Sequence, residues 1–411
     1  MKFTLLTSLP ILCTALVAGA CTAGAGSSSD GLGSGGAASG SGGADASGGN
    51  GTTNDTTTSG QFMDNASSGS SGTCASGPND DADMDGFTGA QGDCNDCDPN
   101  VNPGAIEVLT ADGTGGGGGA VPADEDCDGQ IDNVPMPCDS GIAIDTSAPM
   151  DAARAIELCH QATSPTDWGV VSANWVRANG TVLNTASLQM GVLPKFGNNV
   201  VPRGGATMLG LSSGHARDAS QPGACGTYSC SGYGAGTAPP NFPQDVPSCP
   251  GETDINDDVG LEVELRAPTN ATGFSFDFRF YSFEYPEWVC DYYNDQFIAL
   301  VNPAPVGSIN GNVSFDSQNN PVSVNVGYFD VCSGCTQGTG DLSGTGFDTW
   351  DDAGATVWLR STSPIAGGDV VKIRYAIWDT GDQSWDSTAL VDNFQWIANG
   401  GTVVVGTQPP Q

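Results

Sequence analysis

The chain has 411 residues, with 47 acidic side chains against 11 basic ones and a formal net charge of −36. This charge argues against nucleic acid as a partner, because a polyanion requires a basic surface. Glycine accounts for 60 residues and only 14% of the chain is charged, whereas ordinary globular domains have about 25% charged residues. The composition is not that of a typical cytosolic enzyme.

The N-terminal segment 1–20 has the features of a secretory signal peptide. One lysine precedes an apolar run over 3–17, which is too short to span a membrane, and small residues follow it. Small residues directly before Cys21 resemble the lipobox of bacterial lipoproteins, with simple secretion as the alternative. The resemblance implies lipidation at Cys21, attachment to a membrane through that lipid, and a location at the outer membrane or cell surface.

The next segment, 21–73, consists almost entirely of glycine, serine, alanine, threonine, asparagine and aspartate. It has too few apolar residues to offset the entropy cost of ordering. We therefore expect a lipidated N-terminus followed by a disordered Gly/Ser tether.

The segment 74–140 is strongly acidic. Its stretch from Cys74 to Asp132 contains fourteen acidic residues and no lysine or arginine. Such a density of like charge opposes compaction unless a cation neutralises it. We expect a small loop module that is stabilised by disulfides and calcium, the alternative being a solvated acidic linker that binds no ion specifically.

Carboxylates in this segment have the spacing of a calcium loop. In 81–87 aspartates at every second position precede a glycine, as in the first half of an EF-hand loop, and 124–132 repeats the spacing. Calcium takes about six to eight oxygen ligands, and the glycine permits a turn that brings in a backbone carbonyl. The bidentate glutamate of an EF-hand is absent. The candidate metal ligands are Asp81, Asp83, Asp85, Phe87 through its carbonyl, Asp93, Asp96, Asp98, Asp124, Asp126, Asp128 and Asp132.

Four patterns of the module resemble a family of metal-binding repeats in bacterial surface proteins. They are Asp-x-Asp-x-Asp-Gly-Phe at 81–87, Gly-Asp-Cys-x-Asp-x-Asp-Pro at 92–99, Pro-Gly-Ala-x-Glu at 103–107 and Asp-x-Asp-Cys-Asp-Gly-x-x-Asp at 124–132. The segment is also similar to thrombospondin type 3 repeats. In this chain the cysteine usual soon after the glutamate is missing, Cys97 is extra, and a glycine-rich insertion occupies 114–119. The resemblance implies calcium as the cofactor, since both histidines of the chain lie outside the module.

Twelve cysteines remain outside the signal peptide and Cys21. An even number in an exported chain indicates a disulfide framework, whose connectivity stays open. Two pairs, at 94 and 97 and at 332 and 335, have the Cys-x-x-Cys spacing that would indicate zinc or redox chemistry in a cytosolic protein. In an oxidising compartment disulfides are the favoured interpretation.

The segment 141–400 has mostly β patterning. Phenylalanine occupies every second position of 274–280, with polar residues between, which predicts a strand with one face in a core. The segments 322–328 and 371–377 repeat this alternation, and Gly, Pro, Asn and Asp clusters separate them. The chain is therefore expected to be mainly β, a jelly-roll-like β-sandwich. A short helix is expected over Asp151–Leu158, capped near Ser147 or Asp151, and a C-terminal tail over 401–411.

Several motifs of this β region resemble the choice-of-anchor L domain. They lie at 211–214, 283–297, 376–379 and 389–394, and the similarity spans roughly 143–396. That family occurs in exported bacterial surface proteins and has no established chemistry. The resemblance therefore implies display at the cell surface and does not imply a reaction.

Acidic residues of the β region are candidates for ligand binding. Carboxylates beside tryptophan and tyrosine suit a stacked sugar or a further calcium ion, although the same aromatics can simply be core and the carboxylates can hold loops. The candidate ligand-binding residues are Glu284, Glu287, Asn294 and Asp295. A second set, which surrounds the last predicted strand as a structural calcium site or as turn caps, is Asp379, Asp382, Asp386 and Asp392.

Together these features predict a lipid-anchored surface protein for binding or adhesion, without catalysis, whose partner is a surface glycan or a protein. Glu284 and Glu287 could instead serve as the acid and base of a glycan-directed hydrolase. A structural envelope protein without a soluble ligand is the third interpretation.

Overall fold

The computed structural model describes residues 76–109, 123–133, 135–230, 232–349, 352–398 and 400–410. The predicted signal peptide, the lipidation at Cys21 and the tether up to residue 73 lie outside the described residues. Within the described part, no helix has the length and apolar character that crossing a bilayer requires.

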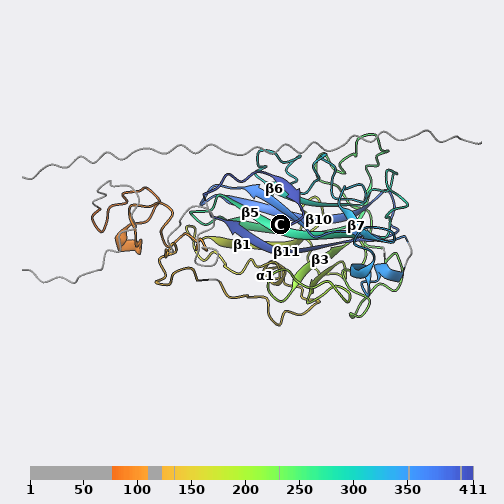
Figure 1. Ribbon diagram of the computed structural model, residues 1–411, viewed down its shortest axis with the longest axis horizontal. Coiled ribbons are helices and arrows are strands. Elements are labelled where there is room, and N and C mark those ends of the chain that lie inside the picture. Colours follow the sequence, from red (N-terminus) through yellow and green to blue (C-terminus); the bar gives the residue numbers. More distant parts are fainter. Residues whose placement is uncertain are drawn as a thin grey trace, which may run out of the picture. The chain divides into compact units, whose positions relative to one another are not determined.

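The described residues are mainly β and form a sandwich of two antiparallel sheets, which confirms the predicted fold class (Figure 1). The smaller sheet has the strand order β1-β4-β10-β6. Its strands are β1 (Gly169–Val176), β4 (Ile255–Arg266), β6 (Gln296–Asn302) and β10 (Val370–Thr380). The larger sheet has the order β12-β9-β5-β11-β3-β2, and β8 joins it at β5 and pairs with β7. Its strands are β2 (Met190–Leu193), β3 (Met208–Ser212), β5 (Gly273–Ser282), β7 (Phe329–Cys332), β8 (Gly354–Thr356), β9 (Leu359–Pro364), β11 (Ser387–Ile397) and β12 (Gly406–Gln408).

Apolar side chains from both sheets meet in one core. The phenylalanines of β5 point into it, as the alternation predicts, and the strands predicted over 274–280 and 371–377 are confirmed as β5 and β10. The Phe276 ring lies 5.0 Å from the Tyr375 ring of β10, and the Phe278 ring lies 5.3 Å from the Phe297 ring of β6. Burial of each such ring contributes about 1.5–3 kcal/mol.

The strand predicted with one face in a core forms, and the other face of β5 is buried as well. Asp277 is fully buried and accepts hydrogen bonds from the guanidinium groups of Arg203 and Arg360, each at 2.6 Å. Arg279 pairs with Asp341 at 2.8 Å. The buried polar residues of the alternation therefore pair with partly exposed partners, Arg203, Arg360 and Asp341, because buried charges are tolerated when they are paired.

The strand predicted over 322–328 is wrong. This segment forms turns, and β7 begins only at Phe329. The Ser323 hydroxyl accepts a hydrogen bond from Asn325 N at 3.2 Å, and Ser323 O accepts one from Val326 N at 3.1 Å. These local bonds replace the ladder of a strand, while the alternating valines are still buried in the core.

The helical elements are short. The helix α1 covers Pro149–Arg154, with Ala155 as its C-cap, and so ends before the predicted Leu158. Glu157, within the predicted range, has a left-handed φ of 66°. The N-cap of α1 is Ala148, directly after the predicted Ser147, and makes no side-chain hydrogen bond, whereas the alternative cap Asp151 lies inside the helix. Residues 401–411, expected as a tail, contribute β12, which pairs with β9. The 3₁₀ turns are η1 (Gly89–Gln91), η3 (Gly340–Leu342) and η4 (Phe347–Thr349).

Disulfides connect the cysteines of the described residues. Cys332 and Cys335 bond to each other, so this Cys-x-x-Cys pair offers no thiolates to zinc. Cys94 instead bonds to Cys127 and joins the two halves of the acidic module, and Cys97 is also disulfide-bonded. The remaining described bonds are Cys138–Cys159, Cys225–Cys230 and Cys249–Cys290.

Candidate functional site

The two acidic loops of the module begin at Asp81 and Asp124 and fold alike. In each loop the first aspartate accepts hydrogen bonds from two later backbone N–H groups, at 2.7 and 3.1 Å in the first loop and at 3.0 Å twice in the second. The glycine of each loop has a positive φ, 98° at Gly86 and 88° at Gly129. Since only glycine adopts this conformation without strain, the Asp-x-Asp-x-Asp-Gly spacing produces the same tight turn twice.

The first loop converges with a second stretch of aspartates. Carboxylate oxygens of Asp81, Asp83 and Asp85 lie within 4.8 Å of one another, and so do those of Asp83, Asp93 and Asp96. The Oδ2 atoms of Asp83, Asp85 and Asp93 are buried and have no hydrogen-bond partner in the described part of the chain. Burial raises the pKa of Asp83 and of Asp93 above the usual value. Converging carboxylate oxygens without donors suit a cation that prefers oxygen ligands.

The second loop converges on Glu107. Oxygens of Glu107, Glu125 and Asp132 lie within 4.8 Å of one another, as do those of Glu107, Asp124 and Asp126. Burial raises the pKa of Glu107 to about 7, although the N–H groups of Asp132 and Asp126 oppose the shift. The sequence analysis did not include Glu107 or Glu125 among the ligands. The sequence did offer a signal for Glu107, because it is the glutamate of the Pro-Gly-Ala-x-Glu motif and lies between the acidic clusters.

Three of the proposed ligands lie outside these groups of described residues. Asp98 Oδ1 accepts a hydrogen bond from Asn100 N at 3.2 Å, and Asp128 Oδ1 accepts one from Gln130 N at 2.7 Å. Phe87 N donates to the Asp85 carboxylate at 2.8 Å. The two aspartates therefore stabilise the turns of their own loops.

Of the four candidate ligand-binding residues in the β region, the structure brings Glu284 and Asp295 together. Asp295 N donates to Glu284 Oε2 at 3.5 Å, and both carboxyls are buried. Burial raises the pKa of Glu284, and it raises that of Asp295 to about 8. The Asn294 side chain accepts a hydrogen bond from Asn325 at 2.6 Å, and Glu287 is exposed. The four residues therefore do not form one binding surface.

The second candidate set, Asp379, Asp382, Asp386 and Asp392, does not form a single group either. Asp379 and Asp386 are buried and interact with each other, whereas Asp382 is only partly buried. Asp392 lies apart, beside Glu157. Burial, followed by the charge of Asp392, raises the pKa of Glu157 to about 9.

The aromatic side chains near these acids pack against one another. The Trp288 ring lies 4.9 Å from the Trp385 ring and 5.1 Å from the Tyr293 ring, and Trp385 also contacts Tyr228. Trp288, Tyr293 and Trp385 are partly buried. Their main contacts are therefore with each other, which favours the interpretation of a packed loop cluster over that of a free stacking platform for a sugar.

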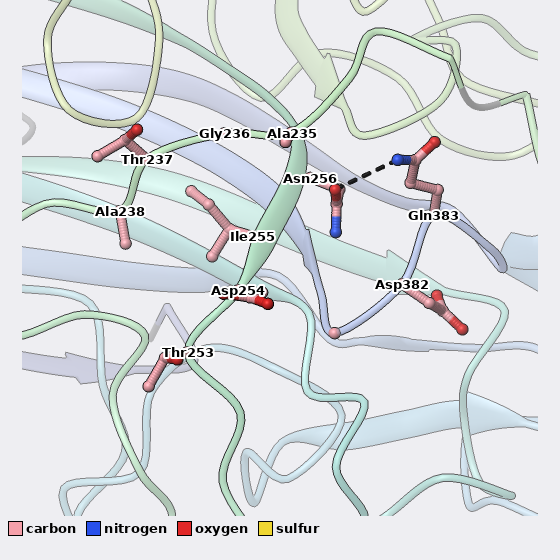
Figure 2. Close-up of a pocket in the computed structure, with 11 residues that line it drawn as sticks. Ala235, Gly236, Thr237, Ala238, Thr253, Asp254, Ile255, Asn256, Asp382 and Gln383 are labelled. Carbon is pink, nitrogen blue, oxygen red and sulfur yellow. Dashed lines mark hydrogen bonds between the residues drawn. The ribbon is translucent and has the colours of Figure 1, made fainter.

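A groove of about 710 Å³ adjoins the acids (Figure 2). It is lined by three segments, 235–238, 253–256 and 381–383. Gln383 donates a hydrogen bond to Asn256 at 3.2 Å across one side. Figure 2 shows the Asp382 side chain at this groove. Burial is the main cause of the raised pKa of Glu284 and of Asp295, and the charge of Asp382 adds to it. The groove is thus the solvent-exposed neighbour of the buried carboxyls.

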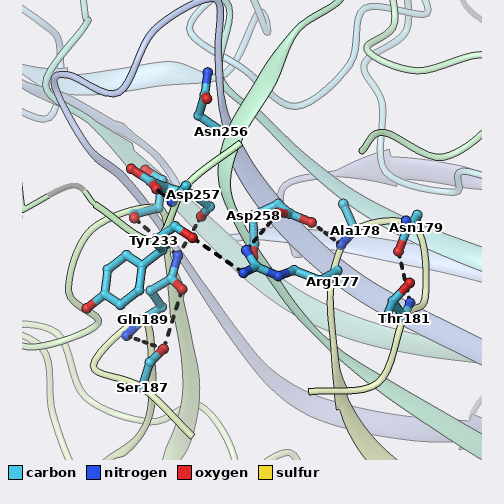
Figure 3. Close-up of polar contacts among 12 residues, drawn as sticks. Arg177, Ala178, Asn179, Thr181, Ser187, Gln189, Tyr233, Asn256, Asp257 and Asp258 are labelled. Carbon is cyan, nitrogen blue, oxygen red and sulfur yellow. Dashed lines mark hydrogen bonds and ion pairs between the residues drawn. The ribbon is translucent and has the colours of Figure 1, made fainter. Parts of the chain in front are cut away.

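Two further buried acids near the groove have partners (Figure 3). Asp258 pairs with Arg177 at 3.0 Å and accepts a hydrogen bond from Ala178 N at 2.7 Å. Asp257 accepts one from Gly234 N at 2.6 Å. These carboxylates fix the loops that border the groove and have no need of an ion.

Residues 210–393 match the sequence model of the Choice-of-anchor L domain. The match runs from β3 to β11 and so includes Glu284, Asp295, Asp379 and Asp386. No curated protein and no solved structure matches the chain. The chain therefore carries a segment similar to the choice-of-anchor L domain, and this similarity indicates a cell-surface protein.

Proposed function

We propose that this cell-surface protein is a lipoprotein whose acidic module binds calcium and which displays its β-sandwich for binding or adhesion. One observation supports the proposal of calcium binding. The Oδ2 atoms of Asp83 and Asp93 are buried and lack hydrogen-bond partners within the described residues. The module contains no lysine or arginine that could neutralise them. Calcium would bind carboxylate oxygens of both loops and take the place of an apolar core.

The test is the melting temperature of the full chain with excess calcium, with chelator, and with magnesium as a control for charge screening. At about 100-fold excess over Kd, binding adds about 2.7 kcal/mol, which corresponds to a rise of roughly 5–10 °C in the transition that involves the module. Asp83→Asn should remove most of this rise. The matched control Asp80→Asn changes an exposed neighbour and should keep it. An equal rise with magnesium, or none with calcium, contradicts the proposal.

The lipid anchor rests on the predicted lipobox at Cys21. Membrane association that is lost in Cys21→Ser would support it, and unchanged association would contradict it. The partner class that we propose is a surface glycan or protein. Binding of the full chain to a glycan array, with calcium and with chelator, distinguishes adhesion from a purely structural envelope role.

The geometry does not favour the hydrolase alternative. Glu284 is buried and Glu287 is exposed, whereas an acid and a base that act on one glycosidic bond must face the same substrate. We therefore propose a non-enzymatic role. Hydrolysis of a surface glycan that is lost in Glu287→Gln would overturn it.

A further inference from the structure

The groove of Figure 2 lies where the start of β4 and the segment after β10 meet a covering loop. Its three lining segments are 235–238, 253–256 and 381–383, and we call it the Asn256 groove. Its volume of about 710 Å³ lies within the range of about 300–1,000 Å³ that is typical of sites for small ligands. All three segments belong to the β domain, so the groove is separate from the acidic module.

Backbone hydrogen bonds join the three lining segments. Gly236 N donates to Ile255 O at 2.8 Å, and Gly381 N donates to Asp254 O at 2.9 Å. A Cβ atom at Gly236 would lie 2.6 Å from the Asp258 carboxylate, so the close approach of this segment to β4 requires glycine. The groove is therefore preformed, and a ligand would not have to order these segments when it binds.

Two amide side chains face each other at the groove. Gln383 Nε2 donates a hydrogen bond to Asn256 Oδ1 at 3.2 Å, and Figure 2 shows this bond. The bond fixes both amides and leaves Asn256 Nδ2 as a donor and Gln383 Oε1 as an acceptor. Neither of these two atoms has another hydrogen bond within the described residues.

Two carboxylates, those of Asp254 and Asp382, also line the groove (Figure 2). Asp382 Oδ1 accepts a hydrogen bond from Ser384 N at 2.9 Å, which orients this carboxylate. None of the ion pairs among the described residues includes either aspartate. Neither belongs to a group of described residues whose ligand atoms converge within 4.8 Å, so the groove does not fit a metal ion.

Packed aromatic rings hold the segment 381–383 in place. Gly381 lies against the Tyr293 ring, because a Cβ atom there would be 3.4 Å from a ring carbon. Trp385, two residues after Gln383, lies 4.9 Å from the Trp288 ring. The aromatic loop cluster therefore supports this segment on both sides, and the polar side chains between are left to the groove.

The lining selects the class of ligand. No lysine, arginine or histidine lines the groove in the described part of the chain, which disfavours phosphates, sulfates and other anions. An ammonium or guanidinium group only donates hydrogen bonds, so it would leave the Asn256 amide donor without an acceptor. A hydroxyl group both donates and accepts, so neighbouring hydroxyls of a sugar can pair with the carboxylates and the amides together.

We propose that the Asn256 groove binds a neutral glycan, whose hydroxyl groups pair with Asn256, Gln383 and Asp382. This inference rests on the proposed function, because it gives the binding role of the β-sandwich a place and a ligand class. A basic segment of a protein is the competing ligand, since it would pair with the same carboxylates.

The test measures binding of the full chain, with calcium present, to an array of neutral glycans, acidic glycans and lysine-rich peptides. We expect neutral glycans to bind and acidic glycans to be rejected. The neutral glycan that binds best is then titrated by calorimetry. Gln383→Ala and Asp382→Asn should each weaken its binding at least about fivefold, with unchanged melting temperatures. The matched control Gln318→Ala changes an exposed glutamine outside the groove and should keep the wild-type affinity.

Hydrogen exchange locates the bound glycan. Amides of 253–256 and 381–383 should exchange more slowly when it is present. Three results overturn the proposal: no binding of a neutral glycan, wild-type affinity in both groove variants, or binding of the lysine-rich peptide in its place. If a glycan binds and both variants keep their affinity, the adhesion function stands although the groove assignment fails. If neither glycans nor peptides bind, the adhesion function fails as well.

Discussion

The acidic module and the β domain use the same residue type in opposite ways. In the module, aspartates sit on loops with hardly any apolar residues beneath them, and Val101 and Ala105 are its buried apolar side chains among the described residues. In the β domain, aspartates lie at the edges of a large apolar core and most have arginine or backbone donors. Acidic composition alone therefore does not define a metal site. The distinguishing feature of the module is that oxygens of three carboxylates converge within 4.8 Å of one another, with no lysine or arginine in the segment.

This comparison predicts that the two regions differ in their dependence on calcium. The β core is held by burial of apolar surface, which needs no ion. The module has little such surface, so its folding should follow ion binding.

The largest effect should come from removing a core ring. Phe278→Ala leaves a cavity between the sheets and should lower the free energy of unfolding by about 3–5 kcal/mol. Urea unfolding with calcium and with chelator should give the same loss, because Phe278 packs only against the β core. The control Val306→Ala, at a residue that is 93% exposed, should stay within about 0.5 kcal/mol. A loss that depends on calcium would show that the core is not independent of the ion.

A smaller effect should appear at Glu157, whose raised pKa of about 9 predicts a pH dependence. The folded state favours the protonated acid, so its contribution to stability is present below the usual pKa of 4.5 and is lost as pH rises toward 9. Glu157→Gln cannot ionise, so the variant should not lose this stability as pH rises. Its melting temperature should match the wild type near pH 5 and exceed it by about 3 °C or more near pH 8.

The matched control for this variant is Glu262→Gln, which removes the carboxylate that pairs with Arg374 at 2.8 Å. It should lose stability slightly instead of gaining it. A Glu157→Gln difference that does not change with pH would contradict the assignment.

Local patterns predicted much of the β fold. The period-two phenylalanines of β5 and the valine and isoleucine alternation of β10 require one buried face, and both strands form. Alternation cannot show what covers the second face, so the burial of Asp277 and Arg279 was not predicted. It also cannot distinguish a strand from turns whose alternate valines are buried, as happens at 322–328.

The candidate sites show the same limit. The spacing within 81–87 and 124–132 is local, and each loop forms the turn that its glycine permits. The contact of Asp295 with Glu284 and Ser387 depends on how distant strands are arranged, and one sequence does not contain that information. Glu107 was missed for a related reason, because its distance from the second loop is set by the fold of the intervening chain.

Hydrogen exchange of the full chain, with calcium and with chelator, tests the central claim most directly. If calcium orders the acidic module, amides in 81–87 and 124–132 should be protected with calcium and exchange freely with chelator, while β5 amides stay protected in both. Protection of the two loops that is the same in both conditions would contradict the claim and leave the module an acidic structure that needs no ion.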